Sequence, residues 1–492
     1  MFRMSLVVVL IGLAVAPSAQ GQDARAVITA ASRAMGVDAL RTVEFTATGH
    51  DFAIGQSGAP GAPWPKFTNP RYTRAVNFET PASRVDRVRV QGEHPPFGGG
   101  LQPIQGEQAQ SQTIVIGAET PWVQQLEIWM LPHGFLRAAA ARSATLERQG
   151  AYSVLSFRGD NGAPVRGFID AQNQVARVET MIDNPVMGDI PFEAIYTDYR
   201  TVQGVQFPMR IVQRQGGFPV FDLSVSDVRV NPPVDIQVAQ GGRGGGGAAA
   251  GAGGAAGAAG AGGRGGGAAV PAVPSEELAP GIRVFAGGYA MIALDMGDHI
   301  VMLESGNSEA RAQAVIAEAK RLMPGKPIRY VVNTHHHFDH SGGLRAFVAE
   351  GSTILTHEWN KPFLQDVLSR PHTLNPDAQE RARRPLSVEG VGDRHVISGN
   401  GKAIELHRLM DFGHTPGMLV AYFPQLRILY EADSYNPGAA DAPPLAVPSP
   451  YNVALLANIE RLNLAVDRIL PVHLPPDGRV VTVAELRRVV GR

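Results

Sequence analysis

Residues 328–343 read IRYVVNTHHHFDHSGG, a short apolar stretch that runs directly into a cluster of histidines and an aspartate. The apolar part is typical of a buried strand. If the following loop is roughly extended, His335 and His337 point to the same side, because side chains alternate along an extended chain. Asp339 continues that side, and His340 lies next to it. Imidazole and carboxylate groups are ligands of zinc and iron, so this loop is expected to serve two adjacent metal ions.

Two ions need more ligands than one loop provides, and three residues farther along the chain are candidates. His414 lies in the turn-like segment 413–417 between two strand-like stretches. Asp433 follows the apolar run 426–430, and His473 follows another strand-like run. Side chains at the carboxyl ends of strands gather at one edge of an α/β domain. We therefore expect these residues to meet the histidine-rich loop.

The pattern His335-x-His337-x-Asp339-His340, followed in order by His414, Asp433 and His473, resembles the metallo-β-lactamase superfamily. The resemblance covers residues 274–492. It implies a four-layer αββα sandwich with a two-metal site at one edge of its two sheets. It also implies how the ligands are shared: His335, His337 and His414 for the first metal, Asp339, His340 and His473 for the second, and Asp433 as the bridge.

The sequence contains no cysteine, so a metal site here must be built from histidine and carboxylate groups. Zinc is the favoured metal, with iron or manganese as alternatives. Two divalent ions about 3.5–4 Å apart would hold a bridging hydroxide nucleophile. Asp339 would bind one ion and orient this hydroxide, which makes it the predicted catalytic residue. The expected substrate is a small molecule with an ester, thioester, lactone, amide or phosphoester bond.

Several alternatives remain open from the sequence. One alternative is a β-lactam hydrolase, although the absence of cysteine and the bridging Asp433 argue against a dedicated β-lactamase. Another is a non-catalytic exported binding protein that keeps the fold as a scaffold. A redox enzyme with a di-iron site shares the same ligands, but no segment resembles a flavin-binding domain.

The chain of 492 residues is long enough for two or three domains. Residues 241–269 consist almost entirely of glycine and alanine, which offer little to bury, so we place a linker at 236–273. It separates residues 22–235 from the predicted metal-binding domain at 274–492. We thus predict an α+β protein of two domains.

Residues 22–235 are predicted to form an antiparallel β-rich domain with helices. Apolar residues of 27–35 share one helical face, and a second helical segment covers 122–141. The segment 196–208 together with 227–231 resembles the half-barrel of LolA-like lipoprotein carriers. That resemblance implies a concave face for an apolar ligand. An accessory domain that packs on or positions the catalytic domain is the preferred interpretation.

Residues 1–21 combine Arg3, a short apolar run and small residues, which is typical of a cleavable signal peptide. We therefore expect a periplasmic or secreted protein. The formal net charge of −1 argues against a nucleic-acid partner. The oligomeric state does not follow from the sequence.

Overall fold

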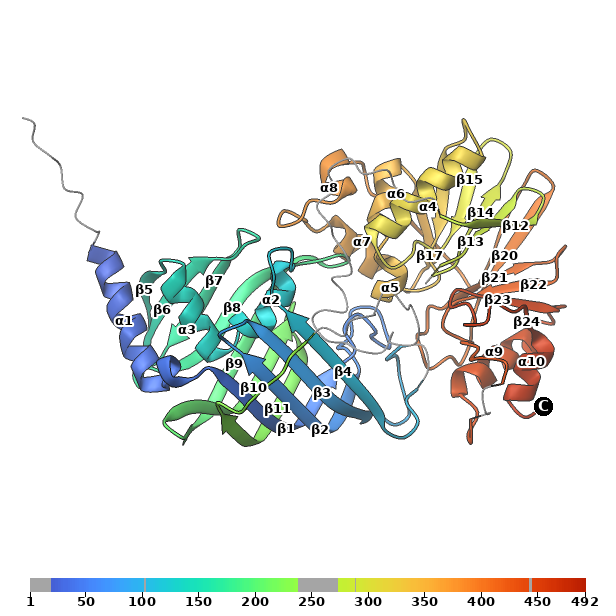
Figure 1. The fold of residues 1–492 in the computed structure, drawn as a ribbon. Helices are drawn as coiled ribbons and strands as arrows, with labels where there is room; N and C mark the ends of the chain where they lie inside the picture. Colours follow the sequence, from blue (N-terminus) through green and yellow to red (C-terminus); the bar gives the residue numbers. More distant parts are fainter. Residues whose placement is uncertain (1–18, 101–102, 238–272, 288, 442–444) are drawn as a thin grey trace, which may run out of the picture.

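The computed structural model describes residues 19–100, 103–237, 273–287, 289–441 and 445–492. Two folded regions lie side by side (Figure 1). Nearly all of the predicted signal peptide (1–21) and of the predicted linker (236–273) falls outside the described residues. Among the residues described, no helix combines the length and apolar character that crossing a membrane requires.

The N-terminal region is built on one antiparallel sheet of 11 strands, in the order β4-β3-β2-β1-β11-β10-β9-β8-β7-β6-β5. Apart from the pairing of β1 with β11, each strand pairs with its neighbour in sequence. This agrees with the predicted antiparallel β-rich domain. The strands are β1 Thr42–Phe52, β2 Lys66–Asn77, β3 Ala82–Gln91, β4 Gln108–Val115, β5 Thr145–Gln149, β6 Tyr152–Arg158, β7 Pro164–Ile169, β8 Val175–Asn184, β9 Gly188–Val202, β10 Val205–Gln215 and β11 Phe218–Val230.

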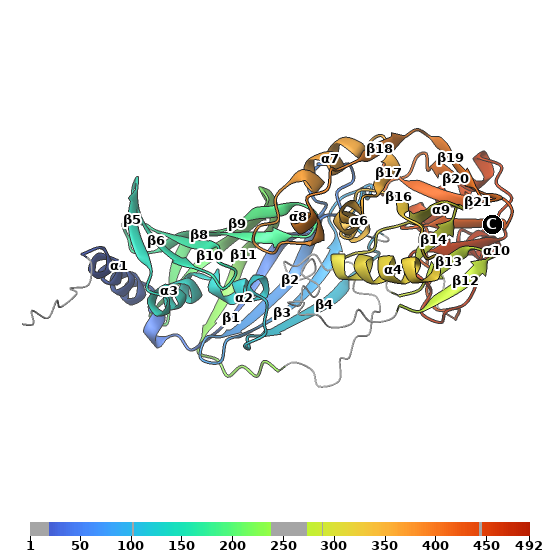
Figure 2. The ribbon, with the colours of Figure 1, turned by 90° about the horizontal axis from the view of Figure 1, so that it is seen from above.

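Helices cover one face of this sheet (Figure 2). The first helix ends where predicted, because Gly36 has a φ of 71° that stops it. Leu126 and Phe135, from the two central helices, are buried together with Phe45 of the sheet. Side chains of these helices therefore pack against this face of the sheet. The apolar ligand that the half-barrel resemblance implies for the N-terminal region stays a prediction. The helices are α1 Ala19–Met35, η1 Val37–Ala39, α2 Trp122–Trp129 and α3 Pro132–Ala141.

The C-terminal region contains two further sheets, ordered β12-β13-β14-β15-β16-β17-β18 and β19-β20-β21-β22-β23-β24. Strands β15 to β18 run parallel, as do β22 and β23. The strands are β12 Ser275–Ala279, β13 Ile282–Phe285, β14 Met291–Asp295, β15 Ile300–Leu303, β16 Ile328–Val332, β17 Thr353–His357, β18 Val388–Val391, β19 Arg394–Gly399, β20 Lys402–Arg408, β21 Leu419–Phe423, β22 Ile428–Glu431, β23 Arg468–Pro471 and β24 Val481–Thr482.

Alternation along β14 shows how the layers are held together. Ile292 and Leu294 are buried with residues of the second sheet, whereas Met291 and Ala293 are buried against α4 on the other face. The predicted αββα sandwich is confirmed: α6 and α7 contact the first sheet, with α4 and α8 against α6, and α10 contacts the second sheet, with α9 against it. The helices are α4 Glu309–Leu322, α5 Phe338–Ser341, α6 Leu344–Glu350, α7 Lys361–Ser369, α8 Ala378–Ala382, α9 Pro450–Arg461 and α10 Val483–Val489.

The two regions pack against each other at several places. The ring of Trp64, in the β1–β2 connection, meets Phe338 of α5 edge to face, with the ring centroids 6.3 Å apart. Elsewhere in the interface, the Asp189 carboxylate at the start of β9 accepts hydrogen bonds from the backbone amide of Thr373 at 2.7 Å and from its hydroxyl at 2.6 Å. The regions therefore share an interface, in keeping with the preferred interpretation of an accessory domain that packs on the catalytic one, although the sequence did not indicate which residues make the contact.

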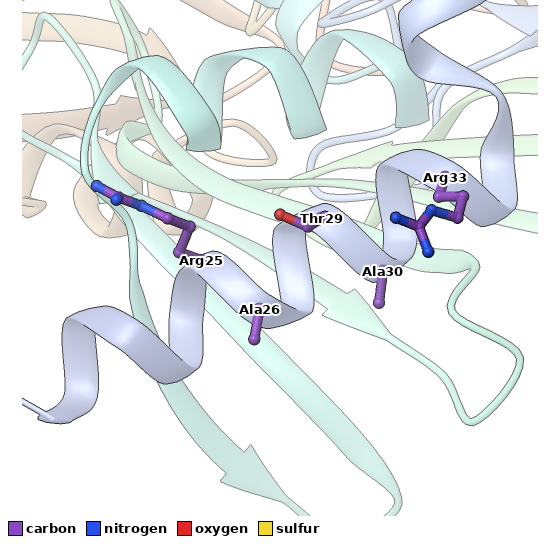
Figure 3. A pocket seen from close by; sticks show the side chains of 5 residues that line it. All are labelled: Arg25, Ala26, Thr29, Ala30 and Arg33. Carbon is purple, nitrogen blue, oxygen red and sulfur yellow. The ribbon is translucent and has the colours of Figure 1, made fainter.

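A shallow hollow lies on the outer surface of α1, at the end of the molecule remote from the C-terminal region (Figures 1 and 3). It is lined by Arg25, Ala26, Thr29, Ala30 and Arg33. None of the predicted site residues belongs to it.

Candidate metal centre

The predicted ligands follow strand ends at one edge of the sandwich. His335 comes shortly after β16, Asp433 after β22 and His473 after β23. His414 lies in the turn between β20 and β21. Because β16 belongs to one sheet and the others to the second, the ligands reach the same edge from both halves of the sandwich.

The histidine-rich loop differs from the extended conformation that we expected. It is extended only as far as His337, whose φ of −62° and ψ of 149° are followed by the short helix α5. Asp339 and His340 therefore leave from a helical turn. The helical turn still directs both side chains toward the edge where His335 lies, so the predicted ligands converge by a different backbone path.

The first group of ligands comprises His335, His337, His414 and Asp433, whose nitrogen and oxygen ligand atoms lie within 4.8 Å of one another. The Nε2 atoms of His335 and His414 are 3.3 Å apart. Asp433 Oδ2 lies 3.3 Å from the first of these nitrogens and 3.0 Å from the second. All four side chains are buried.

The second group comprises Asp339, His340, Asp433 and His473. The other carboxylate oxygen of Asp433, Oδ1, lies 3.3 Å from His340 Nε2 and 2.9 Å from His473 Nε2. His340 Nε2 is also 3.7 Å from Asp339 Oδ2. Asp433 thus turns one oxygen to each group, which is the arrangement of a bridging ligand. The structure brings together all seven predicted residues, and metal binding by them stays a prediction.

The chemistry of these atoms fits divalent cations. His337 Nδ1, His340 Nε2, His473 Nε2 and both oxygens of Asp433 are buried atoms without a hydrogen-bond partner among the described residues. Such a concentration of unpaired polar atoms is costly in a protein interior unless a cation satisfies it. The donor set contains only imidazole and carboxylate, which zinc, iron and manganese all accept.

The electrostatics of the site point the same way. Burial and the neighbouring imidazoles hold the pKa values of His335 and His337 well below the usual range, so both rings are neutral and able to bind metal. Burial opposes charge on His340 as well, but the carboxylates of Asp433, Asp339 and Glu304 raise its pKa well above normal. The centre of the site therefore favours positive charge.

Glu304 is a functional residue that our sequence analysis missed. It directly follows β15 and is buried, and its Oε2 lies 3.2 Å from His340 Nδ1. Its other oxygen accepts hydrogen bonds from the backbone amide and the hydroxyl of Thr334, and that hydroxyl lies 3.0 Å from His335 Nδ1. Glu304 therefore orients two predicted ligands from behind, a role that metal sites commonly require. A carboxylate at the end of a buried strand was the available signal.

Other contributors carried no sequence signal. Tyr289, which precedes β14, donates a hydrogen bond from its hydroxyl to Asp339 Oδ2 at 3.1 Å. Its ring lies edge to face with His473, at 4.8 Å between centroids. Gln56 and Ser57 reach the centre from the N-terminal region. His336 is not among the grouped ligands, and its Nε2 lies 3.0 Å from the Ser57 hydroxyl.

Comparison with known proteins assigns the C-terminal region to a family. Residues 289–473 match the model of the metallo-beta-lactamase superfamily, so this region carries a domain of that superfamily. Among solved structures, a metallo-beta-lactamase from Pontibacter korlensis is similar at 15% identity and a TM-score of 0.34, covering 44% of this chain and 97% of that one. An inverting sec-alkylsulfatase from Pseudomonas sp. is similar at 17% identity and a TM-score of 0.32, and the match covers 44% of this chain and 40% of the sulfatase.

A curated relative is the alpha subunit of 2,4-dinitroanisole O-demethylase from Nocardioides sp. strain JS1661. It is 28% identical over 152 residues, which are 31% of this chain and 43% of that protein. The chain thus matches less than half the length of this relative.

Proposed function

We propose that this protein, whose C-terminal half carries a domain of the metallo-β-lactamase superfamily, is an exported two-metal hydrolase of small-molecule substrates. The observation that carries the proposal is the position of Asp433. One of its oxygens lies within 3.3 Å of His335 and His414, and the other within 3.3 Å of His340 and His473. A carboxylate shared in this way supports a site for two cations rather than one.

Each ligand would have a definite part. His335, His337 and His414 would hold one divalent ion, and Asp339, His340 and His473 the other, with Asp433 between them. When bound, such ions supply a water activated at neutral pH and a Lewis acid for the substrate oxygen. Zinc is the metal we favour.

The protein's own groups would then handle the proton and the approach of the substrate. Asp339 is the most exposed acid of the centre, with 18% of its side chain accessible, so it can accept a proton from the attacking water while binding its ion. Tyr289 holds the second oxygen of that carboxylate, and burial together with Asp339 keeps the pKa of this phenol above its usual range. Tyr289 therefore stays protonated and acts as a hydrogen-bond donor.

The substrate class is proposed as an ester, thioester, lactone, amide or phosphoester, with β-lactams as an alternative. The curated relative is named for demethylating 2,4-dinitroanisole, an aryl methyl ether, so an activated aryl ether is a further candidate substrate.

Export is proposed from residues 1–21. It would be tested by the mass of the mature chain, which is expected to begin at Gln22.

The test is a hydrolysis screen of the metal-loaded mature protein against these bond types, each with a chelator control. Asp433→Ala and His337→Ala are expected to lower turnover by at least about 1,000-fold, because each removes an inner ligand of the site. Circular dichroism of both variants should show the β-rich N-terminal domain intact. Undiminished turnover by both variants, or turnover that survives chelation, would refute the proposal.

A further inference from the structure

The connection between β1 and β2 of the N-terminal region reaches into the metal centre. Its residues 53–58 lie on the histidine-rich loop, where the backbone amide of Phe338 donates a hydrogen bond to the Gly55 carbonyl at 3.2 Å. Gly55 has a φ of 74°, and a Cβ built on it would lie 2.2 Å from the Phe338 ring. The two loops are therefore packed with no room between them. We call residues 53–58 the docking loop.

The docking loop fixes the tautomer of a predicted ligand. His337 Nε2 lies 2.8 Å from the backbone carbonyl of Ser57. A carbonyl oxygen can only accept, so the proton of this neutral imidazole must sit on Nε2. Nδ1, which is buried and has no hydrogen-bond partner in the part of the chain that the structure describes, is then left with a lone pair for a metal.

The neighbouring residue of the loop holds a second predicted ligand. Gln56 Nε2 donates a hydrogen bond to Asp339 Oδ1 at 2.7 Å, while the Tyr289 hydroxyl donates to Oδ2 at 3.1 Å. Asp339 therefore sits between a donor from each region of the protein. Its rotamer is set by both, since a carboxylate without such partners can rotate freely.

The loop also determines from which side the centre is open. The side chains of His335, His414 and Asp433 are fully buried, whereas those of Asp339 and His473 remain 18% and 12% exposed. Ser57 covers the His337 side and is itself buried. A substrate therefore meets Asp339 and His473 first, with Gln56 and Tyr289 at the rim.

We propose, building on the two-metal hydrolase function above, that the docking loop is part of the active site. Ser57 sets the tautomer of His337 through its carbonyl, and Gln56 is a positioning residue for Asp339. The N-terminal domain is then an obligatory component of the metal centre rather than a separate carrier module.

The test measures metal binding, which does not require a known substrate. The full chain is stripped of metal and titrated with cobalt(II), following the visible spectrum and the stoichiometry. Gln56→Ala removes the donor to Asp339, and Gln56→Leu also removes it while keeping a similar side-chain volume. Gln105→Ala is the matched control, because Gln105 donates to the Val447 carbonyl at 2.9 Å across the same interface but is exposed and does not contact a ligand.

Both Gln56 variants are expected to bind the second cobalt ion about 10–100-fold more weakly, with the first ion unaffected. Gln105→Ala should bind both ions as the wild type does, and melting curves should show that all three variants fold. Wild-type affinity in either Gln56 variant, or equal weakening by Gln105→Ala, would overturn the inference while leaving the hydrolase proposal intact. A wild-type chain that binds fewer than two cobalt ions would overturn the hydrolase proposal itself.

Discussion

Glu304 shows how a single side chain behind the ligands organises the predicted centre. It is buried, and it is one of the few residues other than glycine with a positive φ, 68°. This backbone conformation is unfavourable for most side chains and persists where the surroundings fix it. Here it lets one carboxylate reach both His340 and Thr334.

Replacing this carboxylate by an amide should weaken metal binding. Glu304→Gln keeps the shape but places an amide group between His340 and Thr334, both of which present donors to it. We expect about 10–100-fold lower affinity for the second ion, measured by competition with a chromophoric chelator. Glu309→Gln, on α4, serves as the control because its carboxylate accepts from the Ala378 amide, away from the ligands. Equal affinities in wild type and Glu304→Gln would contradict this role.

The residues that sequence reasoning found and missed differ in what fixes their position. His335, Asp433 and His473 follow short buried strands, so local pattern and strand order brought them to one edge. Gln56 and Ser57 lie 283 and 280 residues before their partners in the chain, and their contacts exist because two domains dock. Periodicity and composition carry no information on such docking.

Among the elements, the β1–β2 connection connects the fold to the site most directly. The expected strand and helix pattern was confirmed in the places where the apolar pattern was strong, as in the helix α1 and the strand β16. The expected extended loop was wrong beyond His337, because Phe338–Ser341 closes a helical turn against the docking loop. The backbone conformation of such a short segment is determined by the residues that pack against it, which the sequence pattern does not show.

A methyl group on this connection should separate the loops. Gly55→Ala brings a Cβ within 2.2 Å of the Phe338 ring and also strains a φ of 74°. Gly61→Ala carries the same strain at a φ of 76°, yet its Cβ meets only Phe363, at 3.9 Å. We expect Gly61→Ala to cost about 1 kcal/mol and Gly55→Ala about 1–3 kcal/mol more. Thermal melting of the two variants measures the difference. Identical melting temperatures for Gly55→Ala and Gly61→Ala would show that the docking loop accommodates the added methyl group without loss of stability.

At the scale of the whole molecule, a Gly/Ala-rich segment at 241–269 suggests two independent domains, but the interface argues otherwise. The hairpin of β8 and β9 is tied to residues 371–375 through Asp189, and the docking loop is tied to the ligands. A sequence-derived boundary marks where the chain passes between domains. It does not show how much of one domain's function depends on the other.

Metal removal should therefore be felt in the N-terminal domain. The backbone amide of Gln56 donates a hydrogen bond to the Ala53 carbonyl at 3.1 Å, and the backbone amide of Gly99 donates one to the Gln56 carbonyl at 2.9 Å. Hydrogen exchange at these two amides therefore reports on the docking loop. Without cations His337 and Asp339 lose the metal bonds that would fix their side chains, and these two residues hold the docking loop. We expect these two amides to exchange with deuterium about 10-fold faster after chelation, equivalent to about 1.4 kcal/mol of local stability. The β5–β6 hairpin, at the remote end of the sheet, should be unchanged (Figure 1). If the exchange rates at Gln56 and Gly99 are the same before and after chelation, the two domains are in contact but metal binding does not stabilise the docking loop.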